Sequence, residues 1–152
     1  MRRNEKEINQ KSEIESVIYQ STVCRIGMSD SDMPYIVPLC FGYRDGRIYV
    51  HSSLKGKKID ILRKNRNVCF EFDHNAEIVT AENACKWGMK YRSVIGFGKA
   101  SFIQDPEDKR KALEVIMNQY AEGTFRFSEK EINGTAVIEI EIESMTGKQS
   151  EG

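Results

Sequence analysis

The sequence predicts a mainly β fold, with an antiparallel core sheet of six strands, closed or partly open as a barrel, and flanking helices. Segments in which apolar and polar residues alternate outnumber the helical ones, and most follow one another through short turns, as antiparallel strands do. At 152 residues the chain also has the size of one domain with one core. We therefore expect a single domain over residues 1–152 and no doubly wound parallel sheet.

The first expected elements are a short helix and two strands. Ser12-Glu13-Ile14-Glu15 has the spacing of a capping box, which predicts a helix that runs to about Tyr19. Strands are expected at 23–28 and 35–43, with a turn between them. Pro38 lacks a backbone donor, so the second of these strands forms a sheet edge at that point or contains a bulge.

The middle of the chain alternates between strands and one helix. Arg44-Asp45-Gly46 predicts a tight hairpin turn that leads into a strand at 47–52. The apolar spacing then predicts a helix over 57–65 and a strand over 67–72. Residues 73–90 show no clear period, and we expect them to be irregular.

The last third combines a long strand, a helix and a final strand. One face of the strand expected at 91–103 carries only Val94 and small residues, so another backbone or a flat ligand can approach it closely. Asp105-Pro106 is a strong helix start, because Asp caps a helix and Pro suits its first turn. Isoleucines at 138, 140 and 142 alternate with glutamates, which predicts a half-buried strand.

Composition excludes several classes of protein. The chain has 23 basic and 23 acidic side chains and a formal net charge of +0, which argues against a dedicated nucleic-acid binder. No apolar run approaches the ~20 residues that span a bilayer, and no hydrophobic stretch follows the N-terminus as in a secretory signal. We expect a cytoplasmic protein that contacts no membrane, with loose ends at 1–11 and 149–152.

The cysteines and histidines do not predict a metal site. The four cysteines form no Cys-x-x-Cys pair, and three of them (Cys24, Cys40 and Cys69) lie in apolar runs, where we expect core thiols. His74 stands close to Glu71 and Asp73, but such a group at a strand end usually faces solvent. We therefore expect neither a disulfide framework nor a bound metal.

The strongest local constellation runs from His51 to Lys58, where a strand passes through a short loop into a helix. It places the hydroxyls of Ser52 and Ser53, the flexible Gly56, and the ammonium groups of Lys57 and Lys58 beside the free N–H groups of a helix start. Cations at this end oppose the helix dipole unless an anion binds there, so the pattern indicates a phosphate site. A lysine-rich, solvated helix start is the alternative.

Two further segments have both structural and functional interpretations. His51 lies on the strand face opposite Ile48 and Val50, where it serves as a proton donor, a ligand contact or a histidine at the rim. The stretch from Trp87 to Ser93 holds the only tryptophan together with Met89, Tyr91 and Arg92. Such residues pack on a barrel rim, line a flat ligand or form an interface core.

These segments resemble the pyridoxamine 5′-phosphate oxidase-like FMN-binding split-barrel family, and within it the nitroimidazole-resistance (Nim) branch. The resemblance covers Val23 to Lys148, and its segments occur in the family's order. They are Val23-Cys24-Arg25-Ile26-Gly27, Pro34-Tyr35-Ile36-Val37-Pro38-Leu39, Phe41-Gly42-Tyr43, Tyr49-Val50-His51-Ser52-Ser53, Gly56-Lys57-Lys58, Trp87-Gly88-Met89-Lys90-Tyr91-Arg92-Ser93-Val94-Ile95-Gly96 and Ile140-Glu141-Ile142-Glu143-Ser144-Met145-Thr146-Gly147-Lys148.

The resemblance implies a split β-barrel that works as a homodimer, with one FMN in each of two clefts between the subunits. It places the flavin phosphate against Ser52, Ser53 and the turn at Gly56-Lys57-Lys58, and the flavin ring along a strand. The resemblance to the Nim branch also implies that His51 faces the substrate side of the flavin. The remaining cofactor-binding residues that it implies are Val37, Pro38, Leu39, Cys40 and Phe41 beside the ring, and Trp87, Tyr91 and Ser93 from the partner subunit.

The chain departs from the true oxidases of vitamin B6 at several points. It ends at Gly152 without their C-terminal segment, and Tyr35 and Cys40 stand where they carry arginine and lysine. The resemblance thus implies an FMN-dependent oxidoreductase that takes electrons from a nicotinamide donor and reduces nitroaromatic or other electron-poor small molecules. Two alternatives stay open: a flavin carrier or sensor without turnover, and a cleft that holds haem or a deazaflavin.

Overall fold

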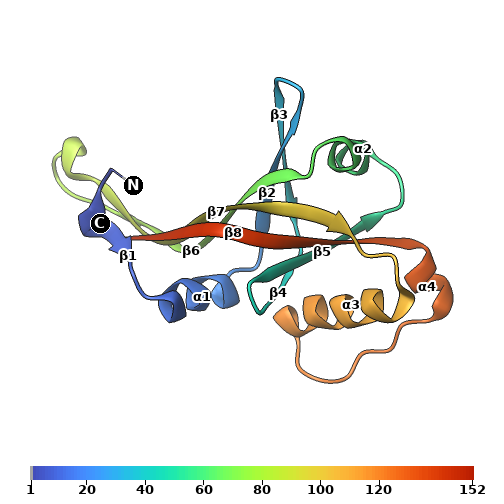
Figure 1. Cartoon of the computed structure of the whole chain (residues 1–152). Coiled ribbons are helices and arrows are strands. Elements are labelled where there is room, and N and C mark those ends of the chain that lie inside the picture. The colour runs from blue at the N-terminus through green and yellow to red at the C-terminus, as the bar shows by residue number, and fades with distance from the viewer. Residues whose placement is uncertain (1) are drawn as a thin grey trace.

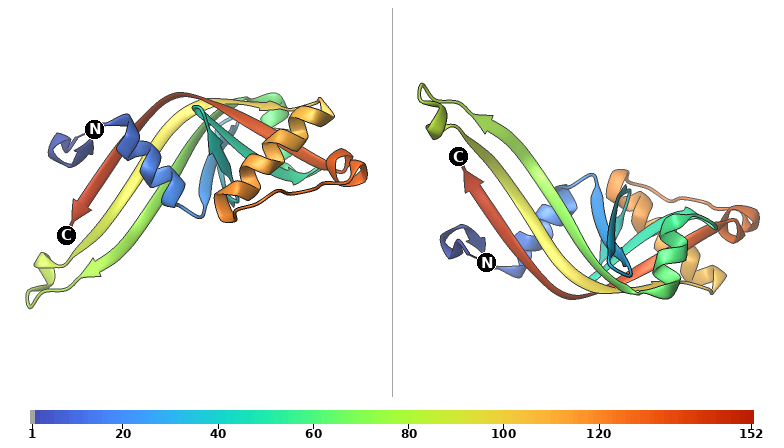
Figure 2. Two further views of the ribbon diagram at one scale, coloured as in Figure 1. Left: turned by 90° about the horizontal axis from the view of Figure 1, so that it is seen from below. Right: turned by 90° about the horizontal axis from the view of Figure 1, so that it is seen from above.

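The computed structural model describes residues 2–152, and its main feature is one antiparallel sheet of eight strands in the order β3-β2-β6-β7-β8-β5-β4, with β1 paired to β8 (Figure 1). The sheet twists and bends along its length (Figure 2). The strands are β1 (Glu7–Ile8), β2 (Cys24–Asp30), β3 (Met33–Leu39), β4 (Gly42–Arg44), β5 (Arg47–Ser53), β6 (Asn67–Val79), β7 (Gly88–Phe102) and β8 (Thr135–Glu151).

The sheet curls into a partly open barrel because its two edge strands are joined directly. Only Cys40 and Phe41 separate β3 from β4, which are the first and last strands of the sheet. The mainly β split-barrel fold and its antiparallel pairing are therefore confirmed, with eight strands in place of six. The edge position of β3 also accounts for Pro38, which needs no partner on the open side.

Among residues 2–152, six helical segments surround the sheet. α1 and α2 add their buried isoleucines, valine and leucine to the barrel core, whereas α3 covers the outer side of β4 and β5. In Figure 1, α2 lies above the β7–β8 ribbon, with α1 and α3 below it. The segments are η1 (Asn4–Lys6), α1 (Lys11–Gln20), α2 (Lys57–Lys64), η2 (Ala84–Lys86), α3 (Pro106–Tyr120) and α4 (Glu129–Asn133).

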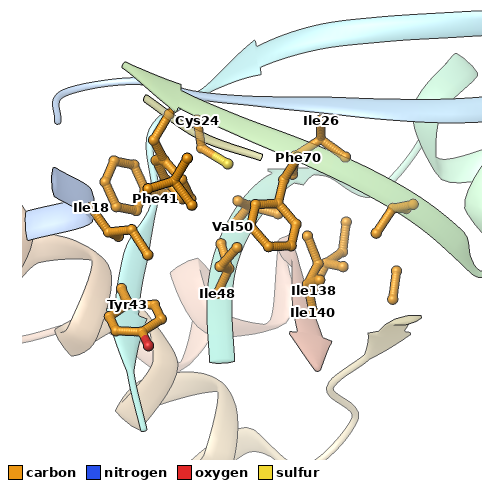
Figure 3. Close-up of a cluster of buried hydrophobic side chains, with 14 of the residues drawn as sticks. Ile18, Cys24, Ile26, Phe41, Tyr43, Ile48, Val50, Phe70, Ile138 and Ile140 are labelled. Carbon is orange, nitrogen blue, oxygen red and sulfur yellow. The ribbon is translucent and has the colours of Figure 1, made fainter. Parts of the chain in front are cut away.

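The core fills the barrel with aliphatic and aromatic side chains from almost every strand (Figure 3). Phe41, Phe70 and Phe72 are almost fully buried and pack edge to face, with Phe72 4.8 Å from Phe41 and 5.8 Å from Phe70 between ring centres. Ile138 and Ile140 of β8 lie in the same cluster, as the alternation of isoleucine and glutamate predicts. Burial of side chains of this size is the main stabilising contribution to the fold.

The small face of β7 points into the barrel. A Cβ atom on Gly96 would lie 2.2 Å from the Phe70 ring and 2.6 Å from the Ser144 carbonyl oxygen. Gly98 is equally close to the carbonyl of Glu141, beside an irregularity in the β7–β8 register. The groups that approach this face closely are therefore the Phe70 ring and the backbone of β8. They fill the space beside the glycines, where a flat ligand was the alternative expectation.

Several local expectations differ from the structure. α1 begins at Lys11 after Gln10, with no side-chain cap, because Ser12 lies inside the helix; the capping box that forms is Ser128 with Glu131. Residues 73–90 are largely ordered as a ribbon of β6 and β7, bulged between His74 and Glu77. That bulge breaks the alternation on which the sequence interpretation relied.

The ends of the chain and the cysteines also differ from expectation. Residues 7–8 and 149–151, expected to be loose, pair within the sheet as β1 and the end of β8. Cys24 is buried, but Cys40 and Cys69 are exposed like Cys85, because alternation places Cys69 on the outer face and Cys40 lies between two strands. No helix among residues 2–152 is long and apolar enough to cross a membrane.

Candidate functional site

The candidate site begins at the N-terminus of α2. The hydroxyl of Ser53 donates to the carbonyl of Lys55 at 2.7 Å, which closes the loop after β5. Gly56 then holds the N-cap position with φ of 145°, a conformation that favours glycine, and no side chain caps the helix. The first N–H groups of α2 therefore have no side-chain acceptor and face the loop, as an anion site requires.

Ser52 adds a buried polar group near the end of β5, just before this loop. Its residue is only 9% exposed, and its hydroxyl oxygen has no hydrogen-bond partner. It is the single side-chain atom in that condition among residues 2–152. A buried hydroxyl without a partner is costly, and such groups in native proteins usually serve a ligand or a water molecule.

Lys57 connects this loop to β3. Its ammonium group lies 4.6 Å from the centre of the Tyr35 ring, within the range of a cation–π interaction. Lys58 is the next residue of the same helical turn and is half-buried. The structure thus brings together Ser52, Ser53, Gly56, Lys57 and Lys58, and it adds Tyr35, which the sequence identified only as a departure from the oxidases.

From Tyr35, β3 runs away from the helix start as the open edge of the sheet. The side chains of Val37 and Leu39 are half-buried against the core, whereas Pro38 and Cys40 are exposed. On the open edge, backbone N–H and C=O groups of β3 lack strand partners. This strand can therefore offer backbone hydrogen bonds to a ligand that lies along it.

Phe41 is anchored by both its side chain and its backbone. Its side chain is fully buried, and its N–H donates to the Tyr120 hydroxyl at 3.0 Å. Tyr120 in turn donates to the carbonyl of Thr22 at 2.8 Å, and burial raises the pKa of this phenol to about 12. Tyr120 thus anchors the segment after β3 to α3. The sequence did not indicate this role, because Tyr120 stands in an apolar stripe of the helix.

His51 lies on the opposite face of β5 from the barrel core, as predicted. It is exposed and stands opposite Val137 of β8, at the border of a second apolar cluster formed with α3 and α4. Ser52, the next residue, points to the other face. His51 and the Ser52 hydroxyl therefore act on different sides of β5 within one chain.

Trp87, Tyr91 and Ser93 lie in the arm formed by the ends of β6, β7 and β8, which projects from the helix-covered part of the molecule (Figure 2). Tyr91 pairs with Ser150, whereas Ser53 pairs with Thr135 at the other end of the same strand. The path along β8 between these points is about 50 Å at ~3.3 Å per residue. One chain does not bring the arm residues to the α2 site.

The outer face of the sheet carries an apolar groove. Ile36, Gly27, Cys69 and Phe97 stand opposite one another on four neighbouring strands, and Ile36 and Phe97 are 64% and 58% exposed. With Tyr35 and Val68 they line a groove of about 500 Å³. Gly27 makes it possible, because a Cβ there would lie 2.5 Å from the Cys69 sulfur.

A charged cluster lies on the same face. Arg25 bonds to Asp73 at 2.8 Å and to Glu71 at 3.2 Å, so one guanidinium serves two carboxylates. Burial and the neighbouring Asp73 raise the pKa of Glu71, against the opposing effect of Arg25. Within residues 2–152, no group of three His, Cys, Asp or Glu side chains is placed to hold a metal ion.

Comparisons with known proteins agree with this geometry. The profile of the family described as pyridoxamine 5′-phosphate oxidase matches residues 10–149. The structure is similar to that of a proposed 5-nitroimidazole antibiotic resistance protein from Bacteroides thetaiotaomicron, with 37% identity and a TM-score of 0.85. That match covers 94% of this chain and 86% of the other. An uncharacterized protein of Rhizobium meliloti is 25% identical over 148 residues, 91% of each chain.

More distant structures share the fold. The flavocytochrome Anf3 from Azotobacter vinelandii has a TM-score of 0.87 at 22% identity, over 100% of this chain and 72% of its own. An FAD- and haem-binding protein from Mycobacterium smegmatis has a TM-score of 0.87 at 18% identity, over 97% and 74% of the two chains. These two likenesses bear on the fold alone.

Proposed function

This chain belongs to the pyridoxamine 5′-phosphate oxidase family, and from that membership we propose that it is an FMN-binding oxidoreductase. We further propose that it acts as a homodimer and reduces small nitroaromatic or similarly electron-poor compounds. The observation that supports flavin binding best is the buried, unpartnered Ser52 hydroxyl, in the segment that leads directly into the uncapped N-terminus of α2.

The phosphate of the flavin is assigned to the loop between β5 and α2. The helix start supplies free N–H groups, Ser52 supplies a buried hydroxyl, and Lys57 and Lys58 supply positive charge. These donors fit a dianionic phosphate, since hydrogen bonds between charged partners are worth about 1.5–3 kcal/mol each. Without an anion the two lysines oppose the helix dipole, so the same site explains an otherwise unfavourable charge placement.

The flavin ring is assigned to the open edge of β3. Tyr35 contacts Lys57 at the phosphate end, and the strand continues through Val37 to Leu39, with Cys40 directly after it. The N–H of Phe41 is already bonded to Tyr120, and Pro38 has no N–H. Because Pro38 faces the open side, alternation turns the N–H groups of Val37 and Leu39 toward β2. The backbone groups assigned to the ring are therefore the Cys40 N–H and the carbonyls of Pro38 and Cys40, with Phe41 limited to its carbonyl, while Val37 and Leu39 are assigned to contact the ring with their side chains.

The homodimer is proposed because one chain presents only part of the site. Trp87, Tyr91 and Ser93 lie at the far end of β8 from the α2 loop, so a second chain has to bring its arm to that loop. The apolar groove on the outer face, with Ile36 and Phe97 exposed, is a surface that such a contact would bury. Aromatic residues and arginine, as in the arm, are typical of interface cores.

The chemistry follows from this arrangement. The flavin, when bound, supplies electron transfer between a nicotinamide donor and the substrate. The protein fixes the phosphate at α2 and orients the ring along β3. His51 is exposed and is assigned to contact the substrate or deliver a proton from its imidazole. Reduction of a nitroaromatic compound is favoured by the 37% identity to the proposed 5-nitroimidazole resistance protein.

The deciding experiment is an absorbance spectrum of the purified protein, followed by anaerobic addition of NADH and NADPH. Flavin bands that bleach, followed by turnover of a nitroaromatic panel, support the proposal. Flavin bands that stay oxidised favour a carrier or sensor. Absence of flavin bands after incubation with FMN would contradict it, and acid extraction of the chromophore separates FMN from FAD, haem and a deazaflavin.

A further inference from the structure

Two guanidinium groups line one cavity at the far end of α2, away from the candidate site. Arg63 lies in the last turn of the helix and Arg66 just beyond it. The guanidinium carbon of Arg63 is 4.5 Å from the centre of the Phe102 ring, and Nε of Arg66 donates to the carbonyl of Ala100 at 2.8 Å. Both side chains therefore lie against the end of β7, which passes below α2 in Figure 1.

Both cations are held in place before any ligand arrives. Arg66 is tied to Ala100 twice, because its own carbonyl also accepts from the Ala100 N–H at 2.9 Å. Arg63 is held by the face of Phe102. The terminal N–H groups of Arg66 stay available for a ligand, and little rotamer entropy is lost on binding.

The cavity between these groups has a volume of about 310 Å³. Leu62 and Phe102 give it an apolar floor, and Ser101 and Gln104 add polar side chains. No carboxylate lines it, and within residues 2–152 neither Arg63 nor Arg66 forms an ion pair. A cation near the last carbonyls of a helix, such as Lys64, is explained by its favourable interaction with the helix dipole. This does not explain Arg63 and Arg66, because their guanidinium groups lie against β7.

We propose that this cavity, the arginine cavity (Leu62, Arg63, Arg66, Ser101, Phe102 and Gln104), binds the phosphate or carboxylate group of a small ligand that also has an apolar part. Guanidinium groups match these oxyanions in planar, two-pronged geometry. Phe102 and Leu62 then contact the apolar part. The site is separate from the α2 N-terminus, since eight helical residues span about 12 Å, and it does not depend on flavin binding.

The test is a calorimetric titration of the purified full-length protein with phenyl phosphate, inorganic phosphate and benzoate, with and without saturating FMN. The variants are Arg63→Met and Arg66→Met, with Arg66→Lys as a milder second change. Lys64→Met is the matched control, because it removes one charge from the same turn without touching the cavity. Lys57→Ala with Lys58→Ala shows whether the probe instead enters the α2 loop.

Saturable binding that weakens at least tenfold in Arg63→Met and Arg66→Met, but not in Lys64→Met, supports the proposal. A preference for phenyl phosphate identifies a phosphate ligand, and a preference for benzoate identifies a carboxylate. No saturable binding up to 10 mM, an equal loss in Lys64→Met, or loss only with the Lys57 and Lys58 variant overturns it. If the protein binds no flavin but binds the anionic probe with this dependence on Arg63 and Arg66, the proposed function is contradicted and the anion site in the arginine cavity is supported.

Discussion

The ammonium group of Lys57 lies over the ring of Tyr35, 4.6 Å from its centre. This contact joins the first residue of α2 to the edge strand β3, through two residues that are 22 positions apart in the sequence. It brings the proposed phosphate loop and the proposed ring-binding strand to one place. It also gives Tyr35 a defined role where the oxidases carry arginine: a ring that holds the lysine in position.

Replacing Lys57 and Lys58 together with alanine is expected to weaken FMN binding at least tenfold, because each charge-assisted bond to the phosphate contributes about 1.5–3 kcal/mol. Fluorescence titration with FMN measures the loss, and riboflavin, which has no phosphate, should bind both proteins alike. Tyr35→Leu should produce a smaller loss of the same kind. Unchanged FMN affinity in the double variant would move the phosphate to another part of the protein.

Replacing Ser52 with alanine tests whether its hydroxyl binds the ligand or stabilises the fold. The Ser52 oxygen is buried without a partner, so its removal is expected to leave the flavin-free protein as stable or more stable in urea unfolding. FMN affinity should fall about tenfold or more. Ser53→Ala is the control, since the Ser53 hydroxyl bonds to Lys55 and its loss should cost about 1 kcal/mol of stability. A destabilised Ser52→Ala protein with normal FMN affinity would refute the assignment.

His51→Ala should keep flavin binding and lower turnover. The side chain is exposed on the face of β5 opposite the barrel core, so its removal leaves the fold intact. General acid catalysis contributes roughly 10²–10⁴-fold, and a loss in that range of the nitroaromatic reduction rate is expected. His74→Ala is the matched control. Equal rates in the wild type and His51→Ala would make His51 a bystander.

Sedimentation should show a dimer that carries two flavins. Phe97→Arg places a charge in the apolar groove of the outer face and should raise the dimer dissociation constant at least tenfold, because a buried unpaired charge is costly. FMN affinity should fall with it, since the partner's arm is lost from the site. Lys111→Glu on α3 changes a charge elsewhere and should alter neither property. A flavin-loaded monomer would contradict the arrangement.

The charged cluster predicts a pH-dependent effect on stability. The pKa of Glu71 is raised in the folded chain, so its charged form is disfavoured there, and stability is gained as pH falls through that folded pKa. Glu71→Gln should therefore stabilise the protein at pH 7, by up to about 1 kcal/mol, and the gain should shrink toward zero as the pH is lowered to about 3, below the ordinary range of a glutamate, where the carboxyl is protonated in both the folded and the unfolded chain. Urea unfolding at the two pH values measures this. A destabilised Glu71→Gln at pH 7 would show that its bond to Arg25 dominates.

Much of the architecture follows from local pattern. Alternation placed the strands at 23–28, 47–52 and 138–142, and Asp105-Pro106 marked the start of α3, where the Asp105 carboxylate accepts from the Asp108 N–H at 3.0 Å. These patterns depend only on residues a few positions apart. They therefore predict the same elements in any fold that buries one face of each element. The bulge at His74, the pairing of residues 149–151 and the exposure of Cys69 do not follow, because each depends on which strand lies alongside.

The sequence by itself determined the class of fold, the helix start at Gly56 and the residues gathered there, because backbone conformation, charge and alternation are fixed within a few positions. Only the tertiary structure decided that Tyr35 meets Lys57, that Tyr120 occupies the N–H of Phe41, and that Ser52 has no partner. It also set the arm far from the α2 loop and turned Arg63 and Arg66 toward β7. These relations join residues distant in the chain, and the packing of the whole barrel selects them.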